Sequence, residues 1–266
     1  MNKAEKAERE ILAIDEMSKG DSAVHRMSPL SKLLLTIVYI VITVSFNKYD
    51  ITGIFIMILF PVVGYVASGV PVSTAFWKLR IVLPLVCAVG IINPFLDREI
   101  LFYLGNIGIS GGVVSFITLL LKGVFSLLAS FLLVSTTSVE EICRALRQVH
   151  FPKILTSLFL LTFRYVHVLL EEVSIMTDAY HLRSPGQKGI HISAWGSFLG
   201  QLILRSSDRA GQLYDSMLLR GFQGEFYYAK GRKSAAYSWP VAIICIALAV
   251  TFRFINIAAI FGGVII

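Results

Sequence analysis

The chain has 266 residues, of which 56% are hydrophobic and only 15% are charged, and its mean hydropathy is +0.74. Because soluble domains carry about 25% charged residues, this composition excludes an ordinary soluble protein and predicts a membrane protein. The net charge of +7 does not indicate a nucleic-acid partner, because the basic residues cluster in loops between apolar segments. The three cysteines lie far apart without a CxxC spacing, so neither a metal site nor a disulfide framework is predicted.

Five apolar segments approach the length of about 20 residues that a helix needs to cross a bilayer. In chain order, these predicted spans cover about 30–46, 51–70, 79–96, 112–135 and 237–263. Pro84 lies inside the third span and predicts a kink there. Lys122 and Arg253 are charges inside the fourth and fifth spans, so each is a functional candidate, although a long cationic side chain near a helix end can also reach the interface.

The loop charges predict the orientation of these spans. Lys and Arg are abundant in the N-terminal arm, before the third span and in 138–236, which holds twelve of them, and they are sparse in the two loops between. Since positively charged loops stay in the cytoplasm, we expect the N-terminus and 138–236 inside. The predicted organisation is an all-α polytopic membrane protein with four parts. They are a cytoplasmic arm (1–29), transmembrane helices 1–4 (30–136), a cytoplasmic coupling domain (137–236) and a C-terminal transmembrane helix (237–266).

The segment 138–236 contains two apolar stretches, 154–170 and 192–204. Arg164 and His167 interrupt the first, and the second is too short to span a bilayer. We therefore expect long amphipathic helices over about 153–182 and 193–220, packed on each other and on the membrane face. In the alternative, the two stretches form an additional membrane hairpin, which leaves the orientation of the other spans unchanged.

A seven-residue pattern occurs twice in this segment, as DAYHLRS at 178–184 and as DSMLLRG at 215–221. Both copies hold an acid, a small residue, leucine, arginine and a second small residue at matching positions, in the last turn of a predicted helix. The first small residue lies four positions before the arginine and shares its helix face, which leaves a notch for a neighbouring element. The guanidinium then offers five donors to carboxylates or carbonyls of that neighbour. An arginine before a helix end is common, but its recurrence in this pattern favours a paired docking device.

The candidate docking residues are Ala179, Leu182, Arg183, Ser184, Ser216, Leu219, Arg220 and Gly221. No catalytic or metal-binding residue is predicted, because the five histidines are scattered and no triad can be assembled. The pattern G-x-x-x-x-G-K-[ST] does not occur, so the chain has no phosphate-binding loop of its own. We expect any ATP and Mg²⁺ to be bound by partner subunits rather than by this chain.

The chain resembles the transmembrane T component of energy-coupling factor (ECF) transporters, the EcfT/CbiQ-like permease family. The resemblance lies in Met27–Leu33 (MSPLSKL), in Arg205–Ala210 (RSSDRA) and in the paired motifs Leu182-Arg183-Ser184 and Leu219-Arg220-Gly221. It extends from about residue 25 to the end of the chain. The family commonly has alanine before each arginine, where this chain has leucine twice.

The resemblance implies a non-catalytic subunit of an importer in the bacterial plasma membrane. It implies that Arg183 and Arg220 each dock on one of two cytoplasmic ATP-binding cassette ATPases. A separate membrane S component would bind a vitamin or a transition-metal ion, and the apolar surfaces of 154–170 and 192–204 would form its platform. The implied partners are therefore the ATPases, the S component and the lipid bilayer, without nucleic acid and without a cofactor in this chain.

Two other classes of function stay open. A self-contained secondary transporter would need charges buried in its spans, for which Lys122 and Arg253 are the candidates. An intramembrane enzyme acting on a phosphorylated lipid would need a nucleophile or metal cluster at the membrane face. The sequence leaves undecided the transported substrate, a dedicated or shared ATPase module, the ATPase that each motif meets, and the oligomeric state.

Overall fold

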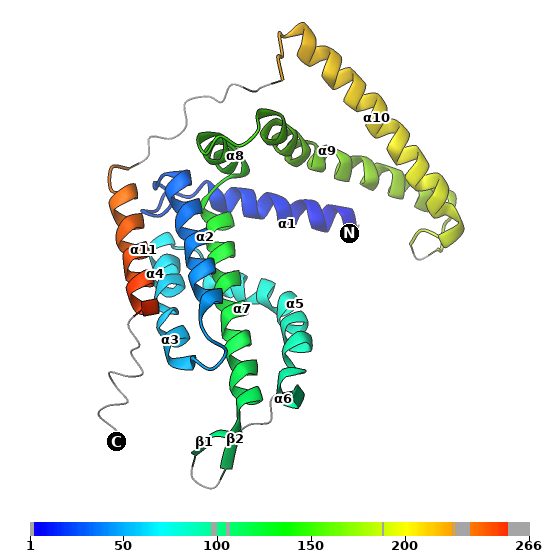
Figure 1. The fold of residues 1–266 in the computed structure, drawn as a ribbon. Helices are drawn as coiled ribbons and strands as arrows, with labels where there is room; N and C mark the ends of the chain where they lie inside the picture. The colour runs from blue at the N-terminus through cyan, green and yellow to red at the C-terminus, as the bar shows by residue number, and fades with distance from the viewer. Residues whose placement is uncertain are drawn as a thin grey trace. The chain divides into compact units, whose positions relative to one another are not determined.

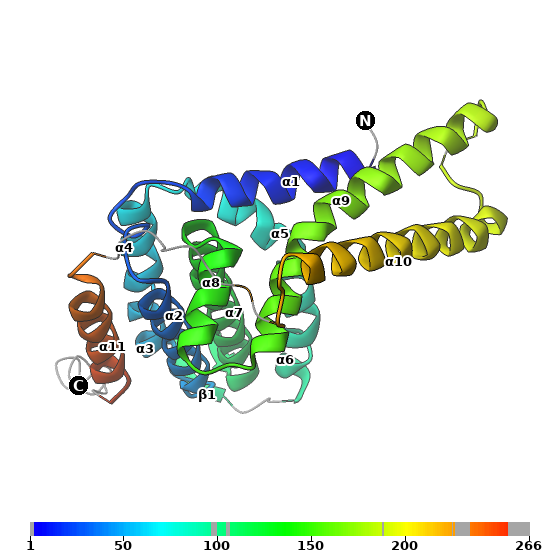
Figure 2. The same ribbon diagram turned by 90° about the horizontal axis from the view of Figure 1, so that it is seen from above.

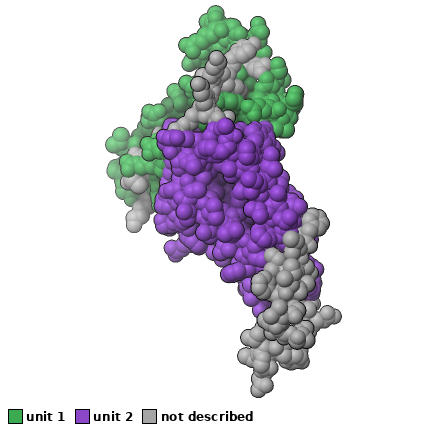
Figure 3. Space-filling model, turned by 90° about the vertical axis from the view of Figure 1, so that its left-hand side faces the viewer, with its two compact units in different colours: residues 1–16, 139–231 green, residues 17–138, 232–266 purple. Residues whose placement is uncertain are grey.

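The structure is a computed structural model that describes residues 3–96, 100–104, 107–187, 189–224, 226 and 235–254. The chain divides into two compact units, which Figure 3 colours separately. We call residues 17–138 with 232–266 the bundle unit, and residues 1–16 with 139–231 the hairpin unit. Both copies of the repeated pattern belong to the hairpin unit.

Apolar helices build the bundle unit, with α7 at its centre (Figure 1). The helices are α2 (Pro29–Ser45), α3 (Ile51–Ile56), α4 (Leu59–Ser68), α5 (Val72–Gly90), α6 (Asn93–Leu96), α7 (Gly111–Thr136) and α11 (Ser238–Phe254). Helices α2 to α6 all pack on α7, and α11 packs on α2. A short antiparallel hairpin of β1 (Ile100–Leu104) and β2 (Ile107–Ser110) precedes α7, where the sequence predicts only a loop.

Tyr39 of α2 shows how the core of the bundle compensates for a helix break. Pro61 of α4 has no N–H to donate to the carbonyl of Met57, four residues earlier, and the chain breaks between α3 and α4 at that point. The buried hydroxyl of Tyr39 instead donates to the Met57 carbonyl over 2.8 Å, and its ring stacks on Phe60 with centroids 4.3 Å apart. The polar group freed by the proline is therefore satisfied inside the apolar core.

The predicted kink in the third span is confirmed. Helix α5 begins at Val72, earlier than the predicted start at 79, and bends by 53° between Arg80 and Val82. A proline ring clashes with the carbonyl four residues before it, which for Pro84 is that of Arg80. The bend therefore lies one turn before the proline that causes it.

Three helical segments are long and apolar enough to cross a membrane, namely Ile51–Ser68, Gly111–Thr136 and Lys153–Arg183, and the bent α5 would be a fourth. Pro29–Ser45 and Ser238–Arg253 are shorter apolar helices. The first matches the predicted span 30–46, and the second matches the first part of the predicted span 237–263, whose residues 255–263 lie outside the described ranges. These helices confirm the predicted class, a helical membrane protein. Because Lys153–Arg183 meets the test by length and composition, both the amphipathic placement and the membrane placement of 154–170 stay predictions.

The hairpin unit holds α1 (Lys3–Ser18, which ends in the bundle unit), α8 (Val139–Gln148), α9 (Lys153–Arg183), the 3₁₀ turn η1 (Ile192–Ala194) and α10 (Trp195–Leu219). Helix α8 packs on α9, and α10 returns antiparallel to α9 (Figures 1 and 2). An ion pair between Glu172 of α9 and Arg205 of α10 joins the two helices. The predicted helices at 153–182 and 193–220 are confirmed to within two residues at each end. The predicted four-part division concerns sides of the membrane and stays a prediction.

Candidate functional site

The first copy of the repeated pattern ends α9 at the turn of the hairpin. Arg183 is the last helical residue, and the N–H of Ser184 donates to the Tyr180 carbonyl over 3.0 Å. Ala179 and Arg183 are exposed, and Leu182 is 84% exposed. The hydroxyl of Tyr180 lies 2.9 Å from the Gln187 side-chain oxygen and accepts the N–H of His191, so it holds the following loop against α9. The arginine is left on an open helix end.

The second copy ends α10 in a different way. Gly221 adopts a φ of +80°, its N–H donates to the Leu218 carbonyl over 2.9 Å, and the N–H of Phe222 donates to the Met217 carbonyl over 3.0 Å. These two bonds form a Schellman motif, which requires the left-handed backbone that glycine adopts without strain. Leu219 is 90% exposed and Arg220 is exposed, while the Ser216 hydroxyl donates to the Leu213 carbonyl of its own helix over 2.8 Å. The glycine therefore turns the chain back after the arginine.

The structure does not bring the two copies together. Arg183 lies where α9 ends and the chain turns toward α10, whereas Arg220 lies at the opposite end of α10 (Figures 1 and 2). A helix of 25 residues such as α10 is roughly 37 Å long. The antiparallel pairing therefore places the two predicted docking points at opposite ends of the α9–α10 pair.

The second copy lines a cavity of about 330 Å³. Its walls come from α9, from the end of α10 and from the segment after α10. The lining residues are Leu161, Arg164, Tyr165, Leu213, Ser216, Met217, Arg220, Gly221, Phe222 and Phe226. The rings of Phe222 and Phe226 lie 5.0 Å apart, and the Ser157 hydroxyl donates to the Gly224 carbonyl over 3.4 Å, which keeps this segment near α9. Sequence reasoning missed Arg164 as a site residue, although its interruption of an apolar stretch was a usable signal.

A neighbouring cavity of about 260 Å³ also lies between α9 and α10, but its charges are of both signs. Arg205 forms its ion pair with Glu172 there, and Asp208 and Arg209 line the same cavity. The ion pair joins the two helices here. Because two acids and two arginines line this cavity, it has no excess of positive charge.

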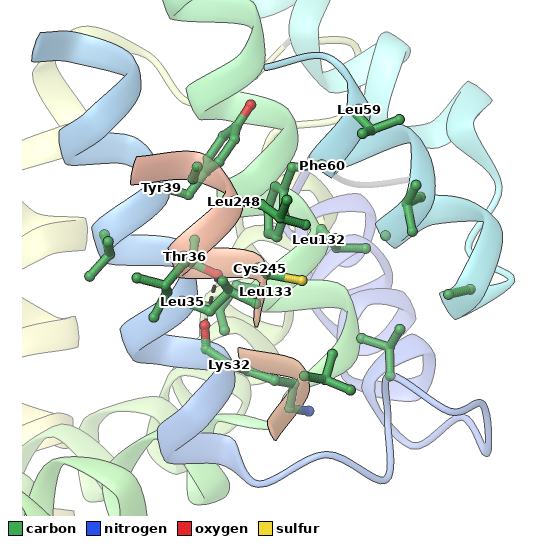
Figure 4. A pocket seen from close by; sticks show the side chains of 18 of the residues that line it. Lys32, Leu35, Thr36, Tyr39, Leu59, Phe60, Leu132, Leu133, Cys245 and Leu248 are labelled. Carbon is green, nitrogen blue, oxygen red and sulfur yellow. Dashed lines mark hydrogen bonds between the residues drawn. The ribbon is translucent and has the colours of Figure 1, made fainter. Parts of the chain in front are cut away.

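The bundle unit contains a cavity of about 260 Å³ with an almost entirely apolar lining from α2, α4, α7 and α11 (Figure 4). The Lys32 amine lies at one end and donates to the Thr136 carbonyl over 2.6 Å. The Thr36 hydroxyl donates to the Lys32 carbonyl over 2.9 Å. Since these polar groups are bonded to the backbone, the cavity suits apolar contents rather than a polar substrate.

Lys122 and Arg253, the two charges predicted inside spans, both bind the C-terminal end of α2. The Lys122 amine donates to the carbonyls of Val44 and Phe46 over 3.0 and 2.5 Å. The Arg253 guanidinium donates to the Ser45 carbonyl over 3.1 Å and lies 5.1 Å from the centre of the Phe46 ring. Carbonyls at a helix C-terminus have no intrahelical partner and carry partial negative charge, so both cations serve as caps.

No group of three or more His, Cys, Asp or Glu side chains with metal-binding geometry occurs among the described residues. The cysteines Cys87, Cys143 and Cys245 are free thiols. Burial, together with the charge of Glu140, raises the pKa of Cys143, so this thiol stays protonated and is a poor ligand or nucleophile.

Comparisons with known proteins agree with these features. The family model described as "Cobalt transport protein" (CbiQ) matches residues 20–228. The chain is 26% identical to the energy-coupling factor transporter transmembrane protein EcfT of Lactococcus lactis, over 77% of this chain and 82% of the relative. It is 25% identical to EcfT of Bacillus subtilis over 84% of this chain and 89% of the relative. It is also 25% identical to the cobalt transport protein CbiQ of Rhodobacter capsulatus, over 68% and 74% of the two chains.

The EcfT relatives are named as transmembrane proteins of energy-coupling factor transporters and CbiQ as a cobalt transport protein, and the apolar helices described above fit a transmembrane component. The match to the family model extends over most of each unit. The chain therefore belongs to the CbiQ family of cobalt transport proteins, as a transmembrane transport component.

Proposed function

We propose that this chain is the coupling subunit of an ECF-type importer, and that its two arginine motifs bind two cytoplasmic ATPase subunits. One observation carries the proposal. Within the described part of the chain, Arg183 and Arg220 lie at exposed helix ends without a hydrogen bond or ion pair. A solvated guanidinium that no neighbour engages is available to carboxylates or carbonyls of another protein.

The proposed mechanism uses the long helices as levers. ATP and Mg²⁺ bind to the partner subunits, and hydrolysis there moves the ends of α9 and α10. Since a continuous helix is stiff along its axis, this movement reaches the membrane, where a separate S component holds a vitamin or transition-metal ion. Exposed apolar side chains on α9 and α10, such as Ile154, Leu158 and Ile203, offer the S component an apolar surface. The chain itself performs no catalysis and is a multi-pass plasma-membrane protein with its N-terminus in the cytoplasm.

Helix capping argues against a self-contained secondary transporter. Such a transporter needs intramembrane charges that can bind a coupling ion or substrate. The amine of Lys122 and the guanidinium of Arg253 instead bond to backbone carbonyls at the end of α2. Both charges therefore have a structural use already.

The docking proposal is tested by charge reversal. The chain is co-expressed with ECF-type ATPase subunits from the same genome and purified by a tag in mild detergent. We expect the double variant Arg183→Glu and Arg220→Glu to lose the ATPases. The variant Arg209→Glu, which reverses an exposed charge elsewhere on α10, should retain them. Co-purification of the ATPases with the double variant at the normal stoichiometry would contradict the proposal.

A further inference from the structure

We infer that Arg164 and Arg220 form one carboxylate-binding site, which receives an acidic side chain of an ATPase subunit. This inference rests on the proposed function and adds a residue that lies outside both copies of the repeated pattern. Arg164 belongs to α9 and Arg220 ends α10, yet both line the same cavity of about 330 Å³. The second docking point is therefore a composite of two helices.

The charge balance of this cavity indicates an anionic ligand. No acidic residue is among its described lining residues, and neither Arg164 nor Arg220 has a hydrogen bond or ion pair within the described ranges. The adjacent cavity provides the contrast, because there Arg205 is paired with Glu172. Two guanidiniums without a counter-charge repel each other, and a carboxylate between them removes that repulsion and accepts hydrogen bonds from both.

The remaining walls favour a carboxylate on a protein over a free phosphate. Aromatic and apolar side chains surround the arginines, among them Tyr165, Met217, Phe222 and Phe226. A partner that covers these walls excludes water and so strengthens a charged hydrogen bond, and the walls also accept the apolar residues that flank an acid on a helix or loop. A highly hydrated phosphate gains little from an aromatic wall of this kind.

The two docking points are consequently different in kind. The Schellman turn at Gly221 returns the chain toward α9, and Phe222 and Phe226 form one wall of the cavity. At the first copy, Arg183 lines none of the cavities described above, and Ser184 ends its helix without a left-handed glycine at that position. We expect the Arg220 site to enclose a side chain and the Arg183 site to bind on an open surface.

The experiment measures ATPase affinity with the intact protein in nanodiscs, by interferometry, for Arg164→Gln, Arg164→Lys, Arg220→Gln and Arg209→Gln. Charged hydrogen bonds of this kind correspond to about 10- to 100-fold in affinity, so we expect such a loss for Arg164→Gln and Arg220→Gln. Arg164→Lys keeps the charge but not the planar donor pair and should recover part of the affinity. Arg209→Gln, on the same helix but in the other cavity, should stay within about 2-fold.

The outcomes separate this inference from the proposed function. If Arg220→Gln weakens ATPase binding while Arg164→Gln behaves like Arg209→Gln, the composite site is wrong and the docking role stands. If neither Arg164→Gln nor Arg220→Gln changes the affinity, both the docking role of this motif and the composite site fall. If a lipid phosphate is the true ligand, Arg164→Gln should lose bound phosphatidylglycerol in native mass spectra while its ATPase affinity stays unchanged. That result would overturn the inference.

A photo-crosslinker tests the location without removing a charge. Leu161 lines the cavity, whereas its neighbour Thr162 is exposed and does not line it. Benzoylphenylalanine at Leu161 should crosslink to an ATPase subunit in the assembled complex, and the same group at Thr162 should do so much less. Equal crosslinking from both positions, or none from Leu161, contradicts an occupied cavity.

Discussion

Three cations of the bundle unit and the two arginines of the repeated pattern all lie at helix C-termini, but they differ in what they bind. In the bundle unit, Lys32, Lys122 and Arg253 all donate to carbonyls at or just beyond helix C-termini, Lys32 at the end of α7 and the other two at the end of α2. In the hairpin unit, Arg183 and Arg220 also lie at helix C-termini, but their guanidiniums bond to no described residue.

This difference separates cations that are hydrogen-bonded within the chain from cations that are free to bind another molecule. A cation in an apolar bundle must be satisfied internally, because neither lipid nor a packed core provides acceptors. A cation on a solvated helix end is satisfied by water and can exchange that water for a protein ligand. A charge near a helix end therefore does not indicate a binding role until its hydrogen-bond acceptor is known.

The largest expected effect comes from removing a cap in the bundle unit. Lys122→Met leaves the carbonyls of Val44 and Phe46 without their charged donor, which should lower the free energy of unfolding by about 3 kcal/mol. Thermal or denaturant unfolding in detergent measures this change. Arg220→Met should show the opposite behaviour to Lys122→Met. It should change the free energy of unfolding by less than about 0.5 kcal/mol and yet weaken ATPase binding. A Lys122→Met protein of normal stability would break the comparison.

The sequence predicts the local features of this fold well. Helix bounds in the hairpin unit follow from apolar stretches and from the breakers Pro152, Pro185 and Gly221, all of which act within a few residues. The kink from Pro84 is equally local. The β1–β2 hairpin was missed because its short apolar strands follow charged residues, so the whole segment resembles a loop between spans.

The site itself depends on contacts that are distant in the sequence. Arg164 and Arg220 line one cavity only because α9 and α10 are antiparallel with one particular register, and no local pattern in either helix specifies that register. The acceptors of Lys122 lie 78 and 76 residues away, so its role as a cap was also beyond sequence reasoning. The repeated pattern predicted two equivalent docking points, whereas the structure gives them different surroundings.

A smaller effect is expected at the turn that shapes the second proposed docking point. Gly221 has a φ of +80°, and a Cβ added there meets no atom within 4 Å, so Gly221→Ala adds only backbone strain. We expect this change to lower stability by about 1 kcal/mol and to weaken ATPase binding by displacing the cavity wall. The control is Gly211→Ala, also unobstructed but inside α10, which should raise stability by about 0.5–1 kcal/mol. Equal effects at both positions would contradict the assigned role of the turn.

The smallest expected effect concerns the one interhelical ion pair that joins α9 to α10 among the described residues. The side chains of Arg205 and Glu172 are 48% and 17% exposed, so water and salt screen the pair. Glu172→Gln should lower stability by about 0.5 kcal/mol at low salt and by less at 1 M salt. The loss from Lys122→Met should instead depend less on salt, because the acceptors of that amine are neutral carbonyls. Unfolding measured at two salt concentrations therefore distinguishes the two kinds of charge, and a salt-sensitive Lys122→Met would place that amine with the solvated charges of the hairpin unit.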